Sequence, residues 1–195
     1  MRSHSKTSRR SSASGARSGE PPSRDSAQLL RLAPDALTWA DLGTGAGLPG
    51  IVLAILGKDR PGFHVHLVES MAKRCRFLTE VVTGLQLPAT VHQSRAEDLS
   101  LAVDIVTARA VAPLYKGIPL FAPALKKGAR LLLYKGPDME AEIAEAGNEL
   151  KRRKATARVV MITSNRTRLP MLGGAIPDTA IEYQAVGLFA GKYLL

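Results

Sequence analysis

The chain has 195 residues, of which 45% are hydrophobic and 5% aromatic, and it carries a formal net charge of +10. This length predicts one domain with a core of ordinary size. The single cysteine, Cys75, excludes a disulfide framework and a cysteine-rich zinc site, and it favours a reducing compartment such as the cytoplasm. No apolar run reaches the roughly 18 residues that a membrane-spanning helix needs, so we expect a soluble protein without membrane contact.

The positive charge is concentrated in two blocks. Residues 1–24 carry a net charge of +5 and residues 149–168 a net charge of +6, whereas the rest of the chain sums to −1. This distribution is typical of attraction to a polyanion such as nucleic acid, although a solvated tail and a solvated helix end would look the same. Residues 1–24 are rich in Ser and Arg and poor in apolar side chains, so we expect them to be disordered. An organellar transit peptide has a similar composition, but no amphipathic helix is visible here.

From Asp25 onward, the hydrophobic pattern alternates between strands and helices. The pattern predicts strands at 37–42, 65–68, 89–92, 103–107 and 130–134, and helices at 26–31, 51–56, 71–82, 114–125 and 138–153. Strands that alternate with helices of this length form right-handed crossovers. The predicted fold class is therefore α/β, with a doubly wound, mostly parallel Rossmann-like sheet.

In such a sheet, ligands bind beyond the carboxyl ends of the strands, where the segment DLGTGAGLPGI lies. Gly43, Gly45 and Gly47 alternate along it, and a bare backbone of this kind lets a ligand approach closely. Gly45, Gly47 and Gly50 also satisfy the dinucleotide fingerprint G-x-G-x-x-G, which is a weak signal by itself. The preceding carboxylate, Asp41, favours a ligand with a cationic group over a pyrophosphate.

Two further strand ends carry residues suited to an adenosine. Glu69 closes the second predicted strand, where an acid accepts hydrogen bonds from ribose hydroxyls. Ala96 and Glu97 follow the third strand, where an adenine would lie. NAD and S-adenosylmethionine both contain this nucleoside, but a nicotinamide oxidoreductase also needs a substrate lobe for which the chain has little room. The pattern therefore favours S-adenosylmethionine, with the oxidoreductase as a distant alternative.

The segments DSAQLL, DLGTGAGLPGI, VESMAKRCRFL, SRAEDL, DIVTARAVAPL and LKKGARLLLYKG lie between Asp25 and Lys154. This run resembles the RsmG (GidB) family, whose members use S-adenosylmethionine to methylate N7 of a guanine in bacterial 16S ribosomal RNA. The resemblance implies a class I methyltransferase fold, with 16S ribosomal RNA or the small ribosomal subunit as partner. It also implies cofactor contacts at Gly43, Leu48, Ala96, Glu97 and Arg109, to which the loop argument adds Gly45, Gly47 and Glu69.

The residues agree with N7 methylation. Methylation of an exocyclic amine typically uses an Asn or Asp followed by Pro-Pro-aromatic after the fourth strand, where this chain has Thr107, Ala108 and Arg109. Methylation of a pyrimidine carbon needs a cysteine nucleophile, and Cys75 lies on the apolar side of a predicted helix. Guanine N7 has an exposed lone pair and loses no proton, so it requires no general base.

We predict that Arg109 is the catalytic residue and holds the O6 edge of the guanine or a phosphate. Lys73, Arg74 and Lys135 are candidate RNA contacts, although solvated lysines and arginines would give the same pattern. His64 and His66 share a strand face but lack an apparent third ligand, so no metal site is predicted.

Both ends depart from the family pattern. Members normally have a longer helical region before the DS pair, and residues 165–195 do not read like the closing strands of the family. We therefore divide the chain into a disordered segment 1–24, a methyltransferase domain 25–164 and an atypical C-terminal segment 165–195, and we expect a misassigned reading frame at both ends. The expected result is an intact cofactor pocket with poorly packed ends. A methyltransferase for another substrate and a cofactor-binding remnant without activity stay open as alternatives.

Overall fold

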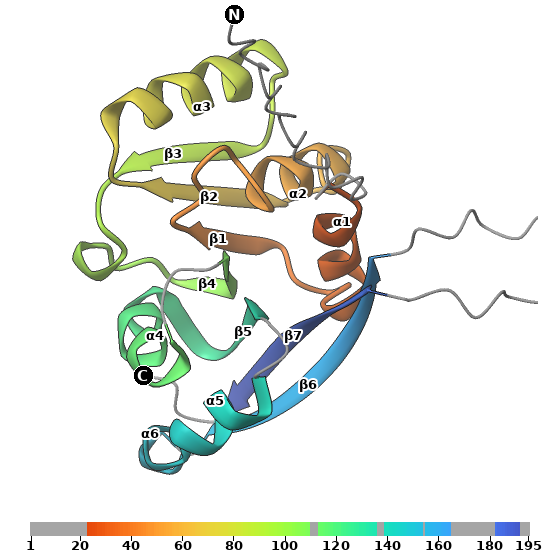
Figure 1. The fold of residues 1–195 in the computed structure, drawn as a ribbon. Helices are drawn as coiled ribbons and strands as arrows, with labels where there is room; N and C mark the ends of the chain where they lie inside the picture. Colours follow the sequence, from red (N-terminus) through yellow and green to blue (C-terminus); the bar gives the residue numbers. More distant parts are fainter. Residues whose placement is uncertain (1–22, 110–112, 136–138, 154, 165–181, 192–195) are drawn as a thin grey trace, which may run out of the picture.

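The computed structural model describes residues 23–109, 113–135, 139–153, 155–164 and 182–191 (Figure 1). The helices are α1 (Ser23–Leu32), α2 (Gly50–Leu56), α3 (Ala72–Gly84), α4 (Leu114–Phe121), α5 (Met139–Glu145) and α6 (Gly147–Arg152), with two short 3-10 helices, η1 (Ala96–Asp98) and η2 (Ala122–Ala124). The strands are β1 (Thr38–Leu42), β2 (His64–Glu69), β3 (Ala89–Gln93), β4 (Val103–Arg109), β5 (Leu125–Lys135), β6 (Ala155–Ser164) and β7 (Glu182–Gly191).

The strands form one sheet in the order β3-β2-β1-β4-β5-β7-β6. The first five are parallel to one another, and β7 pairs antiparallel with both β5 and β6. The order reverses beside β1, where the chain leaves for β2 on one side and later returns to β4 on the other. This topology confirms the predicted doubly wound α/β class and places the switch point at the end of β1.

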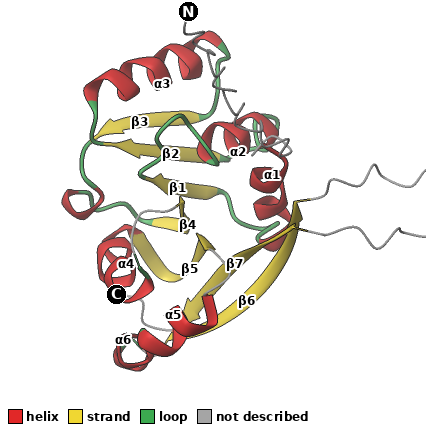
Figure 2. Cartoon of the chain, viewed as in Figure 1, coloured by secondary structure: helices red, strands yellow, loops and turns green. Residues whose placement is uncertain are grey.

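Two apolar layers cover the sheet because successive side chains of a strand point to opposite faces. On one face, Leu29 of α1, Leu53 of α2 and Leu78 of α3 pack in the same cluster as Trp39 of β1. On the other face, residues of α4 and α6 pack with Ala40 and Leu42 of β1. Trp39 is fully buried, and Cys75 is buried, which agrees with its predicted place on the apolar side of a helix. Figure 2 shows α1, α2 and α3 around the end of the sheet that holds β1–β3, and α4–α6 beside the other strands.

The antiparallel strands β6 and β7 are absent from the sequence prediction. Residues 182–191 insert between β5 and β6, with backbone pairs from Arg130–Ala190 to Lys135–Ala185 on one side. We expected a poorly packed C-terminal segment and did not predict this strand. The rest of that segment, residues 165–181 and 192–195, lies outside the described part of the chain. At the other end, α1 begins at Ser23, inside the segment that we predicted to be disordered, and residues 1–22 are not described.

Two predicted helices are shorter or divided. The helix predicted at 114–125 ends at Phe121, and Pro123 lies in the following 3-10 helix because proline cannot donate the next helical hydrogen bond. The helix predicted at 138–153 consists of α5 and α6, which are separated at Ala146. Within the described residues, no helix is both long and apolar enough to cross a membrane.

Candidate active site

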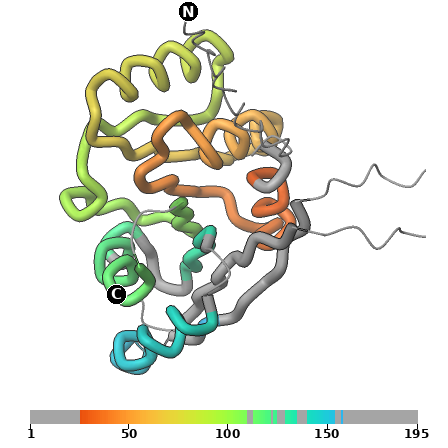
Figure 3. Tube along the Cα trace, in the orientation of Figure 1, coloured from red at the N-terminus to blue at the C-terminus, as the bar shows by residue number. Residues whose placement is uncertain are grey.

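The glycines of the loop between β1 and α2 share a left-handed backbone but differ in the space around them; Figure 3 traces the loop as the orange turn after β1. Gly43, Gly45 and Gly47 have φ angles of 68°, 61° and 96°, in the left-handed region that side chains rarely adopt. A Cβ at Gly47 would collide with the side chain of Ile51, whereas a Cβ at Gly45 would meet only the Gly43 carbonyl oxygen at 3.9 Å. Gly47 is therefore required by packing, and Gly45 leaves open space.

The carboxylate of Asp41 holds this loop in place through hydrogen bonds. Its Oδ2 accepts hydrogen bonds from the Gly50 backbone N–H at 2.8 Å and from the Thr44 hydroxyl at 2.5 Å. A Cβ at Gly50 would collide with Asp41 and Leu67, so the carboxylate and the helix start are in direct contact. We expected Asp41 to face the ligand, but it is fully buried and organises the loop instead.

The burial of Asp41 has an electrostatic cost. It raises the pKa of this carboxyl to about 6, although the hydrogen bonds from Thr44 and Gly50 and the charge of Arg109 act in the opposite direction. Within the described structure, Oδ1 of Asp41 and the hydroxyl of Thr107 are buried without a hydrogen-bond partner. These two residues pair in register on β1 and β4. A polar pair thus lies under the loop at the switch point of the sheet.

A pocket of about 270 Å³ opens at the carboxyl ends of β1, β2 and β3. The described residues that line it are Gly43, Val68, Glu69, Ser70, Ser94, Arg95, Ala96 and Glu97. The structure thus brings together four of the residues predicted to contact the cofactor: Gly43, Glu69, Ala96 and Glu97. Three other predicted contacts are not among the lining residues: Gly47, Leu48 and Arg109. The backbone N–H of Gly45 donates a hydrogen bond to Glu69, which lines the pocket.

Glu69 is held rigidly at the base of this pocket. Its Oε1 accepts a hydrogen bond from Met71 N–H at 2.9 Å, and its Oε2 accepts from Gly45 N–H at 3.2 Å and from Arg74 Nη1 at 3.3 Å. Burial raises the pKa of Glu69, but these hydrogen bonds and the charge of Arg74 outweigh it, so the pKa lies below its ordinary value. The carboxylate is therefore ionised at neutral pH and offers an acceptor to the pocket.

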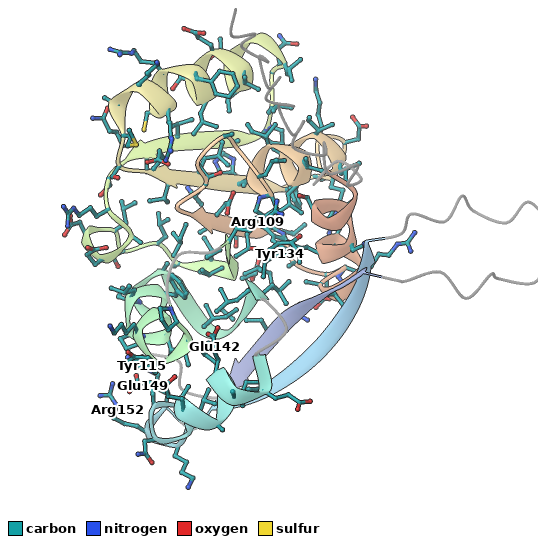
Figure 4. All side chains as sticks on the ribbon, viewed as in Figure 1. Arg109, Tyr115, Tyr134, Glu142, Glu149 and Arg152 are labelled. Atoms are coloured by element: carbon teal, nitrogen blue, oxygen red, sulfur yellow. The ribbon has the colours of Figure 1, made fainter. Side chains whose placement is uncertain are left out.

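Arg109 ends β4, one strand away from the glycine loop. Its guanidinium carbon lies 5.3 Å from the centroid of the Tyr134 ring, and Figure 4 shows the two labelled side chains next to each other. Tyr134 pairs in register with Arg109 and is only 6% exposed. Sequence analysis did not identify Tyr134 as a site residue. Its position near the end of the predicted strand 130–134 is the signal that could have placed it beside the end of β4.

The three candidate RNA contacts have different surroundings. Lys73 is exposed on α3, whereas Arg74 forms an ion pair with Glu69 and so takes part in the pocket. Lys135 ends β5, and its side chain lies outside the described part of the structure. The histidines that we considered as metal ligands include His66, whose Nδ1 lies 2.9 Å from Nε2 of His92. The described residues contain no group of three or more side chains placed to hold a metal ion.

The family model for rRNA small subunit methyltransferase G, GidB, matches residues 24–169. The chain belongs to this family. A ribosomal RNA small subunit methyltransferase G of Caulobacter vibrioides is 62% identical over 122 residues, which cover 63% of this chain and 56% of the relative. The protein of the same name from Methylorubrum extorquens is 44% identical over 151 residues, which cover 72% of each. The chain thus spans little more than half the length of the Caulobacter relative.

Solved structures agree with this GidB assignment at the level of the fold. An S-adenosylmethionine-dependent O-methyltransferase of Thermotoga maritima superposes with a TM-score of 0.62 at 18% identity, over 87% of this chain and 65% of the other. The tRNA (m1A58) methyltransferase of Aquifex aeolicus gives a TM-score of 0.63 at 16% identity, over 87% of this chain and 68% of the other. The fold is therefore that of the class I methyltransferases.

Proposed function

We propose that this chain binds S-adenosylmethionine and transfers its methyl group to N7 of a guanine in bacterial 16S ribosomal RNA. The observation that carries the proposal is the pocket that joins Gly43, Glu69, Ala96 and Glu97 at the carboxyl ends of a parallel sheet. The chain belongs to the GidB family, and its relatives in Caulobacter and Methylorubrum are named ribosomal RNA small subunit methyltransferase G.

The residues of the pocket fit this cofactor. The ionised carboxylate of Glu69 can accept a further hydrogen bond from a ribose hydroxyl, and the 3-10 helix with Ala96 and Glu97 can flank the adenine. The space above Gly45 admits a ligand close to the backbone. When bound, S-adenosylmethionine supplies an electrophilic methyl carbon attached to a positively charged sulfur.

The proposed reaction requires the chain to orient the two reactants and does not require a side chain to transfer a proton. Guanine N7 attacks with its own lone pair and loses no proton, so no side chain has to act as a general base. The planar guanidinium of Arg109 can donate hydrogen bonds to the guanine O6 edge or to a phosphate. Holding the two reacting atoms in line can lower the barrier by roughly 7–11 kcal/mol.

The proposed substrate is based on the family of the chain and on its positive charge. We propose that the acceptor is 16S ribosomal RNA, free or within the small ribosomal subunit, in the bacterial cytoplasm. The net charge of +10 and the exposed Lys73 support attraction to RNA phosphates. Lys135, at the end of β5, is a further candidate contact.

Methyl transfer tests the proposal directly. Labelled S-adenosylmethionine is incubated with 16S ribosomal RNA and with small subunits that lack the modification, using the native chain, Arg109→Ala and the control Arg31→Ala in the last turn of α1. We expect label at one guanine N7, a loss of at least tenfold in Arg109→Ala and no loss in the control. Cofactor binding without transfer to either RNA substrate would contradict the proposed reaction but not the cofactor pocket.

A further inference from the structure

Helix α3 presents one continuous stripe to solvent beside the cofactor pocket. Lys73, Arg76, Phe77 and Glu80 follow the spacing i, i+3, i+4 and i+7, which places them on one face of a helix. The buried residues of α3 are Cys75 and Leu78, on the opposite side. The stripe is therefore exposed to solvent and has no role in the apolar core.

Phe77 is the unusual member of this stripe. Half of its surface, 50%, is exposed, although burial of an aromatic side chain is favourable. Lys73 lies one turn before it and Arg76 directly before it. Neither cation forms an ion pair with a residue that the structure describes, whereas the neighbouring Arg74 is bound to Glu69. An exposed ring beside two cations that form no ion pair with a described residue is an arrangement with which nucleic-acid surfaces stack a base and hold the adjacent phosphates.

The stripe lies next to the cofactor pocket at one end and next to a groove along its side. Arg74 and Glu69 connect the first turn of α3 to the rim of the cofactor pocket. Arg76 and Glu80 also line a groove of about 390 Å³ between α3 and the edge strand β3, together with Cys75, Thr79, Val91 and Gln93. An RNA strand that enters the reaction site from this side would cross the stripe first.

We propose that this face of α3 is a docking surface for a single-stranded segment of RNA next to the target guanine. Phe77 stacks on one base, and Lys73 and Arg76 contact phosphates next to it. The inference rests on the proposed function, because it assumes an RNA substrate. Exposed cations without an ion-pair partner among the described residues favour RNA over a protein partner, and stacking on a side chain requires bases that a duplex would keep stacked on each other.

Fluorescence anisotropy with a labelled 16S ribosomal RNA fragment tests this surface at several salt concentrations. Phe77→Leu keeps an apolar side chain of similar size but removes the ring, so we expect RNA affinity to fall roughly fivefold or more. Phe77→Tyr retains the ring and should bind within about twofold of the native chain. Lys73→Gln and Arg76→Gln should each lower the slope of log K against log salt by about 0.7. Lys58→Gln, an exposed lysine after α2, is the control and should leave the slope unchanged.

The outcomes separate the two proposals. Loss of RNA affinity in Phe77→Leu with normal S-adenosylmethionine binding supports the docking surface, whether or not methyl transfer is observed. Equal losses in Phe77→Leu and Phe77→Tyr would overturn base stacking, and an unchanged salt slope in both glutamine variants would overturn the phosphate contacts. Absence of methyl transfer from a chain that still binds RNA through Phe77 would count against the proposed reaction alone.

Discussion

Arg109 and Tyr134 are register partners at the carboxyl ends of β4 and β5, and the guanidinium carbon of Arg109 lies 5.3 Å from the Tyr134 ring centroid. A cation over an aromatic face is attracted by the quadrupole of the ring, by about 0.5–2 kcal/mol depending on solvent exposure. Because Tyr134 is almost fully buried, its ring is a fixed platform. This contact limits the directions in which Arg109 can point, which matters if Arg109 orients the guanine.

A double-mutant cycle measures this contact. Tyr134→Phe keeps the ring and should retain most methyl transfer, whereas Tyr134→Leu removes it and should lower kcat/KM by roughly twofold to thirtyfold. In the Arg109→Ala background, Tyr134→Leu should have little further effect, because the partner of the ring is already gone. Equal losses from Tyr134→Leu with and without Arg109 would mean that the ring serves stability alone.

Glu69 should determine cofactor affinity. In Glu69→Gln a neutral amide replaces the carboxylate that we assign to a ribose hydroxyl, so the charge-assisted hydrogen bond to the cofactor is lost, and those from Gly45, Met71 and Arg74 are weakened. Such bonds contribute on the order of 1.5–3 kcal/mol, so calorimetry should show S-adenosylmethionine binding about tenfold to a hundredfold weaker. Glu80→Gln on the outer face of α3 is the matched control. Equal affinities in Glu69→Gln and the native chain would remove Glu69 from the cofactor site.

The pH dependence of this affinity follows from the lowered pKa of Glu69. The carboxylate remains ionised above the ordinary value of 4.5, so binding should be insensitive to Glu69 titration from pH 8 down to about pH 5. The contribution of Glu69 to folding is likewise fully present above pH 4.5 and is lost as the pH falls through its lower folded-state pKa. A Glu69-dependent change in cofactor affinity near neutral pH would contradict this assignment.

Asp41 should act on stability in the opposite direction. Its pKa is raised from 3.8 to about 6, so the folded state binds a proton more tightly than the unfolded state does. As the pH falls from 6 towards 4, protonation of Asp41 therefore raises the free energy of unfolding, by on the order of 3 kcal/mol in total. This stabilisation is lost as the pH rises through 6.

Asp41→Asn isolates that effect from the other titrating groups. The amide oxygen can still accept from Gly50 and Thr44, but the side chain no longer titrates. In urea unfolding at several pH values, the variant should be the more stable protein at pH 7, and its advantage should shrink towards pH 4. A difference that stays constant over this range would mean that Asp41 is ionised at all these pH values. Asp41→Ala removes both hydrogen bonds and should destabilise the loop at every pH.

The sequence predicted local elements well because each carries its own periodicity and its own boundary signals. The strand before the glycine loop, the helix from 71 and the strand that ends at Glu69 all lie within two residues of their predicted bounds. Strands β6 and β7 were missed because the place of β7 between β5 and β6 depends on strand pairing, which leaves little local pattern in the sequence.

The sequence predicted those site residues that lie at the ends of strands, because strand ends can be located from the local pattern. Topology places the ends of β1, β2 and β3 together, which is why Gly43, Glu69, Ala96 and Glu97 meet in one pocket. The direction of a side chain depends on packing, which the sequence does not show. Asp41 thus faces the loop rather than the ligand, and the ring of Tyr134 lies against Arg109.

Two glycines of the loop should respond differently to the same substitution. Gly45→Ala adds a methyl group in open space, and its cost is the left-handed backbone alone, roughly 1–2 kcal/mol. Gly47→Ala has the same backbone cost, and its Cβ also collides with Ile51 and approaches Leu78 at 3.1 Å. Overpacking typically adds about 1–3 kcal/mol, so urea unfolding should show Gly47→Ala to be clearly the less stable variant.

Cofactor binding completes the comparison between these two variants. Gly45→Ala should fold and yet bind S-adenosylmethionine more weakly, because its methyl group occupies the open space above Gly45 that we assign to the cofactor. Calorimetry on the folded Gly45→Ala protein, at a temperature well below its unfolding transition, measures this loss without interference from stability. If Gly45→Ala binds as tightly as the native chain, the cofactor does not approach the loop at this position, and the glycine is there for the turn alone.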